Sequence, residues 1–261
     1  MNFCSLYSGS SGNSFFVDGR YGKILVDAGL SGSKITKALQ SIEQNPQELS
    51  GIVVSHDHID HTRGVGVLSR KYDIPIYINE KTYERAQKQL GKIKEENLRI
   101  FQSHETIQIE DLFVEPFQTF HDAAESVGFC LHTDAYKKVS IVTDTGRVSE
   151  EIFDQVKCSD LIVMESNHDE SMLLAGSYPY YLKKRILSDL GHLSNETAAE
   201  AIIELAEQGL KNVVLAHLSQ ENNFPQLAYE TTKIKLMQAG IEKEVHLEVA
   251  PREHRGILYQ L

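Results

Sequence analysis

The stretch VVSHDHIDH, residues 53–61, packs three histidines and two aspartates into its last six positions, directly after an apolar run that is typical of a buried strand. His56 and His58 alternate out of the strand end, so their imidazoles can converge on one metal ion. Asp60 and His61 follow on the turn and can face a second ion nearby. Four nitrogen or oxygen donors in six positions indicate a metal site rather than a charged surface turn.

Two metal ions need more ligands than one segment supplies, and isolated donors occur where other apolar runs stop. His121 follows LFVEPFQTF, Asp144 ends VSIVTD and His217 ends NVVLAH. A layered sheet presents such side chains at its rim. Alone, each would more often be a capped or solvated polar residue, but their shared placement favours one common site.

Composition indicates an ordinary globular protein. The chain has 261 residues, of which 41% are hydrophobic, and we expect one domain over residues 1–261. No signal-like or membrane-spanning stretch is apparent, and the three cysteines are few and far apart. These features predict a cytoplasmic protein with reduced cysteines and no membrane partner.

The net charge of −11 opposes long-range attraction to nucleic acid. A local exception is YPYYLKKRI, residues 178–186, where tyrosines that can stack on bases adjoin Lys183, Lys184 and Arg185. The alternative is a solvated helix face with the tyrosines packed beneath it.

Strand-like runs recur along the whole chain with helical periodicity between them. Two sheets packed face to face, with helices on their outer faces, fit this order best. The predicted strands are 3–7, 14–17, 23–26, 51–54, 74–78, 112–117, 127–131, 139–142, 161–164, 213–215, 245–249 and 256–259. The best predicted helices are 33–42, 81–90, 149–155, 195–208 and 225–239.

The motifs SHDHIDH, TFHD, TDTG and LAHLS, in that order, resemble those of the metallo-β-lactamase superfamily, whose members are αββα sandwiches with a dinuclear site at one edge. The resemblance implies that His56, His58 and His121 bind one metal ion, that Asp60, His61 and His217 bind the other, and that Asp144 bridges them. It also implies that Asp27 supports the site from behind the ligands. Ligand chemistry leaves zinc or manganese as the best candidates, with iron open.

The stretch GHLSNETAAEAIIELAEQGLKNVVLAHLS, residues 191–219, points to a reaction. Its histidine–helix–strand–histidine order resembles the C-terminal part of nucleases such as RNase Z, which places His192 beside the scissile phosphate. In a phosphodiesterase a metal-bound hydroxide attacks phosphorus, and His192 would assist the leaving 3′-oxygen. Glu165 would orient His192, and Asp60 is expected to serve catalysis as well as metal binding. Alternatively, His192 is only a neighbour of the helix N-terminus.

Four segments narrow the resemblance to the YycJ/WalJ family of bacterial proteins, described as 5′-to-3′ DNA exonucleases. They are LYSGSSGNS, SHDHIDH, ESNHDESMLLAGSYPYYLKKRI and GHLSN. The family resemblance implies a DNA substrate rather than RNA, cut from a 5′ end. Two alternatives stay open: a glyoxalase II-like thioester hydrolase, and a metal-bound regulatory or binding protein without turnover. The oligomeric state is left open.

Further polar residues are candidates for substrate binding. Small residues around Ser10, Ser11 and Asn13 can form an anion-binding nest for a terminal phosphate, although a tight turn between two strands is the competing interpretation. Asn167 and His168 can hydrogen-bond substrate near the metals, or His168 can instead support a ligand.

Overall fold

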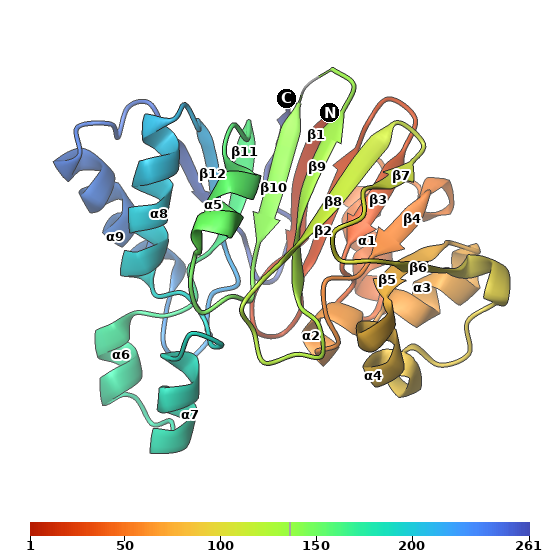
Figure 1. Ribbon diagram of the computed structural model, residues 1–261, viewed down its shortest axis with the longest axis horizontal. Helices are drawn as coiled ribbons and strands as arrows, with labels where there is room; N and C mark the ends of the chain where they lie inside the picture. The colour runs from red at the N-terminus through yellow and green to blue at the C-terminus, as the bar shows by residue number, and fades with distance from the viewer. Residues whose placement is uncertain (136) are drawn as a thin grey trace.

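The computed structural model describes residues 1–135 and 137–261, and within them the chain forms two seven-stranded sheets packed face to face (Figure 1). The first sheet has the order β14-β1-β2-β3-β4-β5-β6 and the second β13-β12-β11-β10-β9-β8-β7. The strands of the first sheet are β1 (Asn2–Tyr7), β2 (Ser14–Asp18), β3 (Lys23–Val26), β4 (Gly51–Val53), β5 (Ile76–Asn79), β6 (Leu98–Phe101) and β14 (Leu258–Gln260). Those of the second are β7 (Ile107–Ile109), β8 (Leu112–Gln118), β9 (Val127–Thr133), β10 (Lys138–Val142), β11 (Leu161–Glu165), β12 (Asn212–Ala216) and β13 (His246–Val249).

Helices cover the outer faces of both sheets. On the first sheet lie α1 (Gly32–Ser41), α3 (Val65–Tyr72) and α4 (Glu80–Leu90), and on the second α5 (Glu150–Val156), α8 (Asn195–Glu207) and α9 (Pro225–Gln238) (Figure 1). The short helix α2 (Ile59–Thr62) lies at the edge of the sandwich, and α6 (Glu170–Ala175) and α7 (Tyr180–Ile186) project beyond it. The predicted αββα architecture, two mixed sheets flanked by helices, is confirmed.

Three apolar layers hold this arrangement together. Side chains such as Phe3, Phe15 and Phe129 fill the space between the sheets and are completely buried. Two further clusters, one between each sheet and its helices, include Leu39 on α1 and Ile202 on α8. Strands buried on both faces read as nearly continuous apolar runs, which is why the sequence revealed them.

The shorter elements differ from the sequence prediction. β6 and β7 were not predicted, because β6 is half exposed and β7 has three residues, too few for a period-two pattern. The strand predicted at 74–78 is β5, which begins two residues later, at Ile76. Pro75 lacks the amide hydrogen that a strand residue donates to its neighbour. α3, α6 and α7 are eight residues or fewer and were not predicted.

Topology gathers strand ends at one edge. β3, β4, β5 and β6 run parallel, as do β10, β11, β12 and β13. β8 points the same way as β10 because both are antiparallel to β9. The carboxyl ends of such strands meet at a common rim. Among the described residues, no helix has both the length and the apolar composition to cross a membrane.

Candidate metal centre

Side chains that follow strand ends from both sheets converge at this rim. Asp27 follows β3 and the SHDHIDH segment follows β4, while the second sheet contributes residues after β8, β10 and β12. Every one of the seven predicted ligands belongs to a group whose donor atoms lie within 4.8 Å of one another. The members are His56, His58, Asp60, His61, His121, Asp144 and His217.

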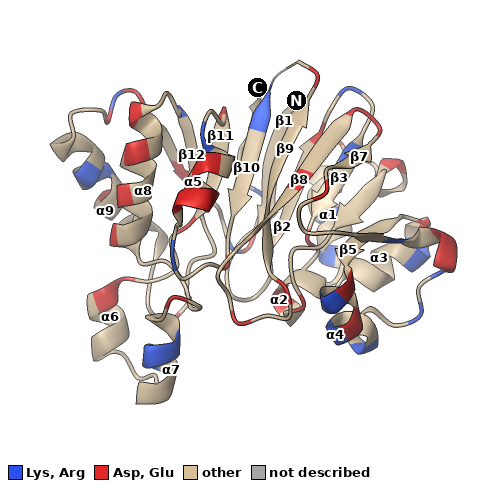
Figure 2. Ribbon diagram, viewed as in Figure 1, with Lys and Arg blue, Asp and Glu red and all other residues tan. Residues whose placement is uncertain are grey.

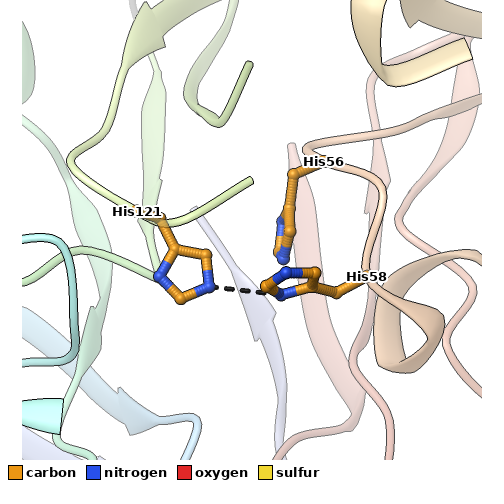
Figure 3. A group of neighbouring side chains, drawn as sticks. All are labelled: His56, His58 and His121. Carbon is orange, nitrogen blue, oxygen red and sulfur yellow. Dashed lines mark hydrogen bonds between the residues drawn. The ribbon is translucent and has the colours of Figure 1, made fainter. Parts of the chain in front are cut away.

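One group consists of three histidines. Figure 3 shows the imidazoles of His56, His58 and His121 facing one another from two separate segments. Nε2 of His121 lies 3.2 Å from Nδ1 of His58. A second group combines Asp60, His61 and His217, with Asp60 Oδ2 3.4 Å from His217 Nε2. Other donor groups cross this division, because His56 also lies with His61 and Asp144, so the assignment of ligands to two ions stays a prediction.

Asp144 lies between the two groups. Its Oδ2 is 3.2 Å from His61 Nε2, and its Oδ1 is 3.6 Å from His121 Nε2 and 3.5 Å from His217 Nε2. The residue is 2% exposed and has a left-handed backbone, with φ of 57°. Its carboxylate can therefore contact two ions at once.

Four of the histidines turn the same nitrogen inward. Their Nδ1 atoms contact protein groups, so Nε2 is the ring nitrogen that points toward the cluster and could bind a cation. The Nδ1 contacts are His56 to Ser55 Oγ at 3.0 Å, His61 to Asp27 Oδ2 at 2.7 Å, His121 to the Gly191 carbonyl at 3.1 Å and His217 to Glu165 Oε1 at 2.9 Å. Nε2 of the fully buried His56 has no hydrogen-bond partner among the described residues. A buried nitrogen oriented in this way fits a metal ligand.

The charges of the cluster also fit a cation. Burial alone would raise the pKa of the Asp144 carboxyl, but the positive charges of His217 and His61 hold it well below its usual range. Burial would lower the pKa of His217, yet the Asp144 carboxylate, together with Asp60 and Glu165, raises it to about 10. Protons on histidines thus neutralise the carboxylates in the metal-free protein, and metal cations would replace these protons.

Asp27 holds this arrangement from behind. Besides its contact with His61, its Oδ1 accepts a hydrogen bond from the Ser55 backbone N–H at 2.8 Å, and its Oδ2 accepts one from Ser55 Oγ at 2.7 Å. Asp57, the remaining acid of the motif, points away and accepts from the Ala124 backbone N–H. Asp27 therefore contacts a predicted ligand, whereas Asp57 does not.

His192 and Glu165 form a second pair beside the cluster. Glu165 is fully buried, and its Oε1 lies 2.7 Å from His192 Nδ1 as well as 2.9 Å from His217 Nδ1. Burial would raise the pKa of Glu165, but His192 and His217 lower it to about 2. Glu165 is thus an ionised acceptor that orients two imidazoles and has no access to substrate.

A cavity of about 400 Å³ opens over the cluster. It is lined by predicted ligands, by His192, and by the predicted substrate-binding residues Ser10, Asn167 and Arg185. Its walls also include five residues that the sequence pattern did not predict to line a cavity: Ile59, Tyr178, Leu182, Ile186 and Ser219. Leu182 and Ile186 lie four positions apart on one side of α7, but a helix of seven residues is too short for its sequence to show such a side by periodicity.

The other predicted substrate-binding residues lie outside this lining. Asn13 is fully buried, where its Oδ1 accepts from the Gly9 N–H and its Nδ2 is 3.0 Å from His61 Nε2. Ser11 is exposed on the adjacent turn. His168 is buried and neither ring nitrogen has a partner among the described residues, and burial lowers its pKa to about 4. Lys183 and Lys184 line a separate hollow.

The chain is similar to known proteins in both sequence and fold. The family model described as a beta-lactamase superfamily domain matches residues 23–218. The chain is 44% identical to exodeoxyribonuclease WalJ of Streptococcus pneumoniae, over 94% of this chain and 91% of that protein. It belongs to the WalJ/YycJ family of the beta-lactamase superfamily. A second member, exodeoxyribonuclease YycJ of Bacillus anthracis, is 41% identical over 92% of this chain and 90% of its own.

The fold of this WalJ/YycJ family member also occurs in solved structures. The crystal structure of the metallo-beta-lactamase fold protein YhfI from Bacillus subtilis superposes with a TM-score of 0.75, covering 99% of each chain at 16% identity. Membership of a metallo-hydrolase fold family, together with the donor clusters, makes the protein a metal-dependent hydrolase that uses divalent ions.

Proposed function

We propose that the protein is a DNA exonuclease whose reaction depends on two divalent metal ions. Manganese and zinc are better candidates for these ions than iron. The proposal rests mainly on one observation. The seven donor side chains lie together, and His192 lines the cavity that opens over them. The two relatives named exodeoxyribonuclease support DNA as the substrate, and they match nearly the whole chain. The 5′-to-3′ direction of cutting rests on the family resemblance. We also propose that the whole chain, residues 1–261, is one domain.

In this proposal His56, His58 and His121 would hold one ion, Asp60, His61 and His217 would hold the other, and Asp144 would be a ligand shared by both sets. The ions would supply an activated water and neutralise charge on the phosphate. Asp60 contributes a partly exposed carboxylate next to the place of attack, with 19% of its side chain accessible.

His192 acts on the leaving group. Its side chain is 14% exposed, lines the cavity and is oriented by Glu165 through Nδ1. Nε2 is therefore the atom that would stabilise or protonate the departing 3′-oxygen, which is the task of a general acid in phosphodiester cleavage. Glu165 is a positioning residue because it contacts imidazoles and is sealed from the cavity.

The substrate phosphate would contact polar groups of the cavity wall. Ser10 and Asn167 offer a hydroxyl and an amide beside the ligands, and Ser11 is the exposed neighbour of Ser10 on the adjacent turn. Asn13 and His168 support the wall from within, because both side chains are buried.

The test is hydrolysis of matched single- and double-stranded DNA and RNA, labelled at one end, with manganese or zinc. We expect nucleotides to be released from the 5′ end of DNA, and an Asp60→Ala/His61→Ala variant to release none. Intact nucleic acids in the presence of protein that binds two ions would refute the proposal. Thioesters would then be the next substrates to assay.

A further inference from the structure

The helical projection, which we define as residues 170–190, carries large apolar side chains in solvent. Tyr180 and Tyr181 are 79% and 75% exposed, and Leu174 and Leu190 are 61% and 51% exposed. The interpretation in which these two tyrosines pack beneath a solvated helix is therefore wrong. Aromatic rings open to solvent beside an active-site cavity point to a binding surface.

α7 presents different faces to the cavity and to the outside. The side facing the cavity carries Leu182, Arg185 and Ile186, and Tyr178, just before the helix, lines the cavity with them. The other side carries Tyr180, Lys183, Lys184 and Leu187, and together with Leu174 and Ser188 these residues line a shallow hollow. Tyr181 lies one helical turn before Arg185, on the border between the two sides. A ligand can thus pass from the cavity over α7 without leaving the surface.

The position of α7 is fixed relative to the metal centre. Arg185 binds both carboxylate oxygens of Asp122, with its Nη2 2.7 Å from Oδ1. Asp122 follows His121, a predicted ligand, and its Oδ1 lies 3.6 Å from that imidazole. Lys183 donates to the Leu174 carbonyl at 2.6 Å, which ties α7 to α6. The exposed tyrosines are therefore held at a constant place beside the cavity.

Charge favours a polyanion as the occupant. Figure 2 shows basic residues gathered on α7, although the whole chain has a net charge of −11. Neither Lys183 nor Lys184 forms an ion pair within the part of the chain that the structure describes. A second copy of this acidic chain would be repelled overall, whereas a phosphate backbone gains from both lysines.

We propose that the outer surface of α7, with Tyr180, Tyr181, Lys183 and Lys184, is a platform for single-stranded DNA that leads away from the cavity. This inference rests on the proposed exonuclease function. The rings stack on bases and the lysines contact the backbone, which is how proteins bind single strands without sequence preference. Base faces are free only in an unpaired strand, so the platform makes the enzyme prefer single-stranded DNA or frayed ends.

The experiment compares a single-stranded oligonucleotide of about 20 nucleotides with the p-nitrophenyl ester of thymidine 5′-monophosphate, which is too short to reach the platform. In the manganese-loaded Tyr180→Ala/Tyr181→Ala variant, we expect the ratio of kcat/KM for the oligonucleotide to that for the ester to fall at least about tenfold, through a higher KM. Tyr180→Phe/Tyr181→Phe keeps both rings and should restore most of the ratio. Tyr21→Ala removes another exposed tyrosine, 66% accessible and in a turn of the first sheet, and is the matched control.

Salt dependence tests the lysines separately. For Lys184→Gln, the slope of log KM against log salt should become shallower by about 0.7, the value for one phosphate contact on a single strand. An unchanged slope and an unchanged substrate ratio in the tyrosine variant, with DNA still cut by the parent protein, would overturn the platform and leave the proposed function intact. A changed sedimentation coefficient with an unchanged KM would assign the surface to a second copy instead. Failure of the parent protein to cut either substrate would refute the proposed function and the platform together.

Discussion

The two sheets contribute to the candidate metal centre in contrasting ways. The first sheet supplies His56, His58, Asp60 and His61 from one six-residue stretch after β4. The second supplies its donors singly, from the ends of β8, β10 and β12, which are separated by other strands and, between β10 and β12, by helices. A dense cluster can be recognised in the chain itself, whereas dispersed donors become a site only when the topology aligns their strand ends.

The two sheets nevertheless hold their donors in a similar way. On the first sheet, the Asp27 carboxylate contacts Ser55 and His61, which lie 28 and 34 positions away in the sequence. On the second sheet, the Glu165 carboxylate contacts His192 and His217, which lie 27 and 52 positions away. Each half of the centre therefore depends on one buried carboxylate and on packing between distant segments.

Asp144 contacts donors from both sheets, so its replacement should have the largest effect on activity. Asp144→Asn keeps the shape and tolerates the left-handed backbone, but it removes the charge shared by both donor groups. We expect kcat to fall by at least about 1,000-fold and bound metal to fall below two ions per chain. Metal analysis by mass spectrometry together with DNA hydrolysis checks this. If the Asp144→Asn variant bound two ions and cut DNA at the parental rate, the donor groups of the two sheets would be independent of each other.

The role of His192 separates chemistry from metal binding on the second sheet. His192→Ala should lower kcat for DNA by about 100-fold or more while the protein keeps its ions, because a general acid is lost but no ligand is. For the p-nitrophenyl ester the loss should be much smaller, because that leaving group departs without a proton. Equal losses on both substrates would contradict the leaving-group role.

On the first sheet, the support of a ligand can be weakened without removing the ligand. Asp27→Asn should reduce metal affinity by about 10- to 100-fold, since His61 loses the carboxylate that orients it. Excess manganese should restore activity. Asp57→Asn is the matched control in the same motif, because Asp57 bonds to Ala124 outside the cluster. Loss of affinity in both variants would indicate general destabilisation.

The smallest expected effect is a change in the thermal stability of the metal-free protein with pH. In the metal-free protein the pKa of His217 is about 10, above its ordinary 6.5. A raised histidine pKa contributes stability that is fully present below about pH 6.5 and is lost as the pH rises towards 10. We expect the Tm of the chelated protein to fall by at least about 2 °C between pH 7 and pH 10, and that of the manganese-loaded protein to change less. A chelated protein that gains stability over this range, as measured by calorimetry, would contradict the protonated cluster.

The sequence predicted the layers and the grouping of the donors, because buried strands are continuous apolar runs and the donors directly follow them. Ligand roles stay predictions, although all seven side chains lie at one rim. The environments of single polar residues were harder to predict. Asn13 reads as part of an exposed nest but is buried against His61, because packing between β1 and β2 decides its exposure. α7 has seven residues, fewer than the two turns needed to distinguish its faces by periodicity.

The hydrogen bond from the His217 backbone N–H to Ser8 Oγ, 2.8 Å long, spans 209 positions of the chain. A ribosome adding about 5–20 residues per second needs roughly 10 to 40 s to pass from one residue to the other. Until residue 217 has been added, the emerging chain displays the SHDHIDH ligands without the complete donor set. If all seven donors are needed, as we propose, the chain gains its activity only after the second sheet has formed.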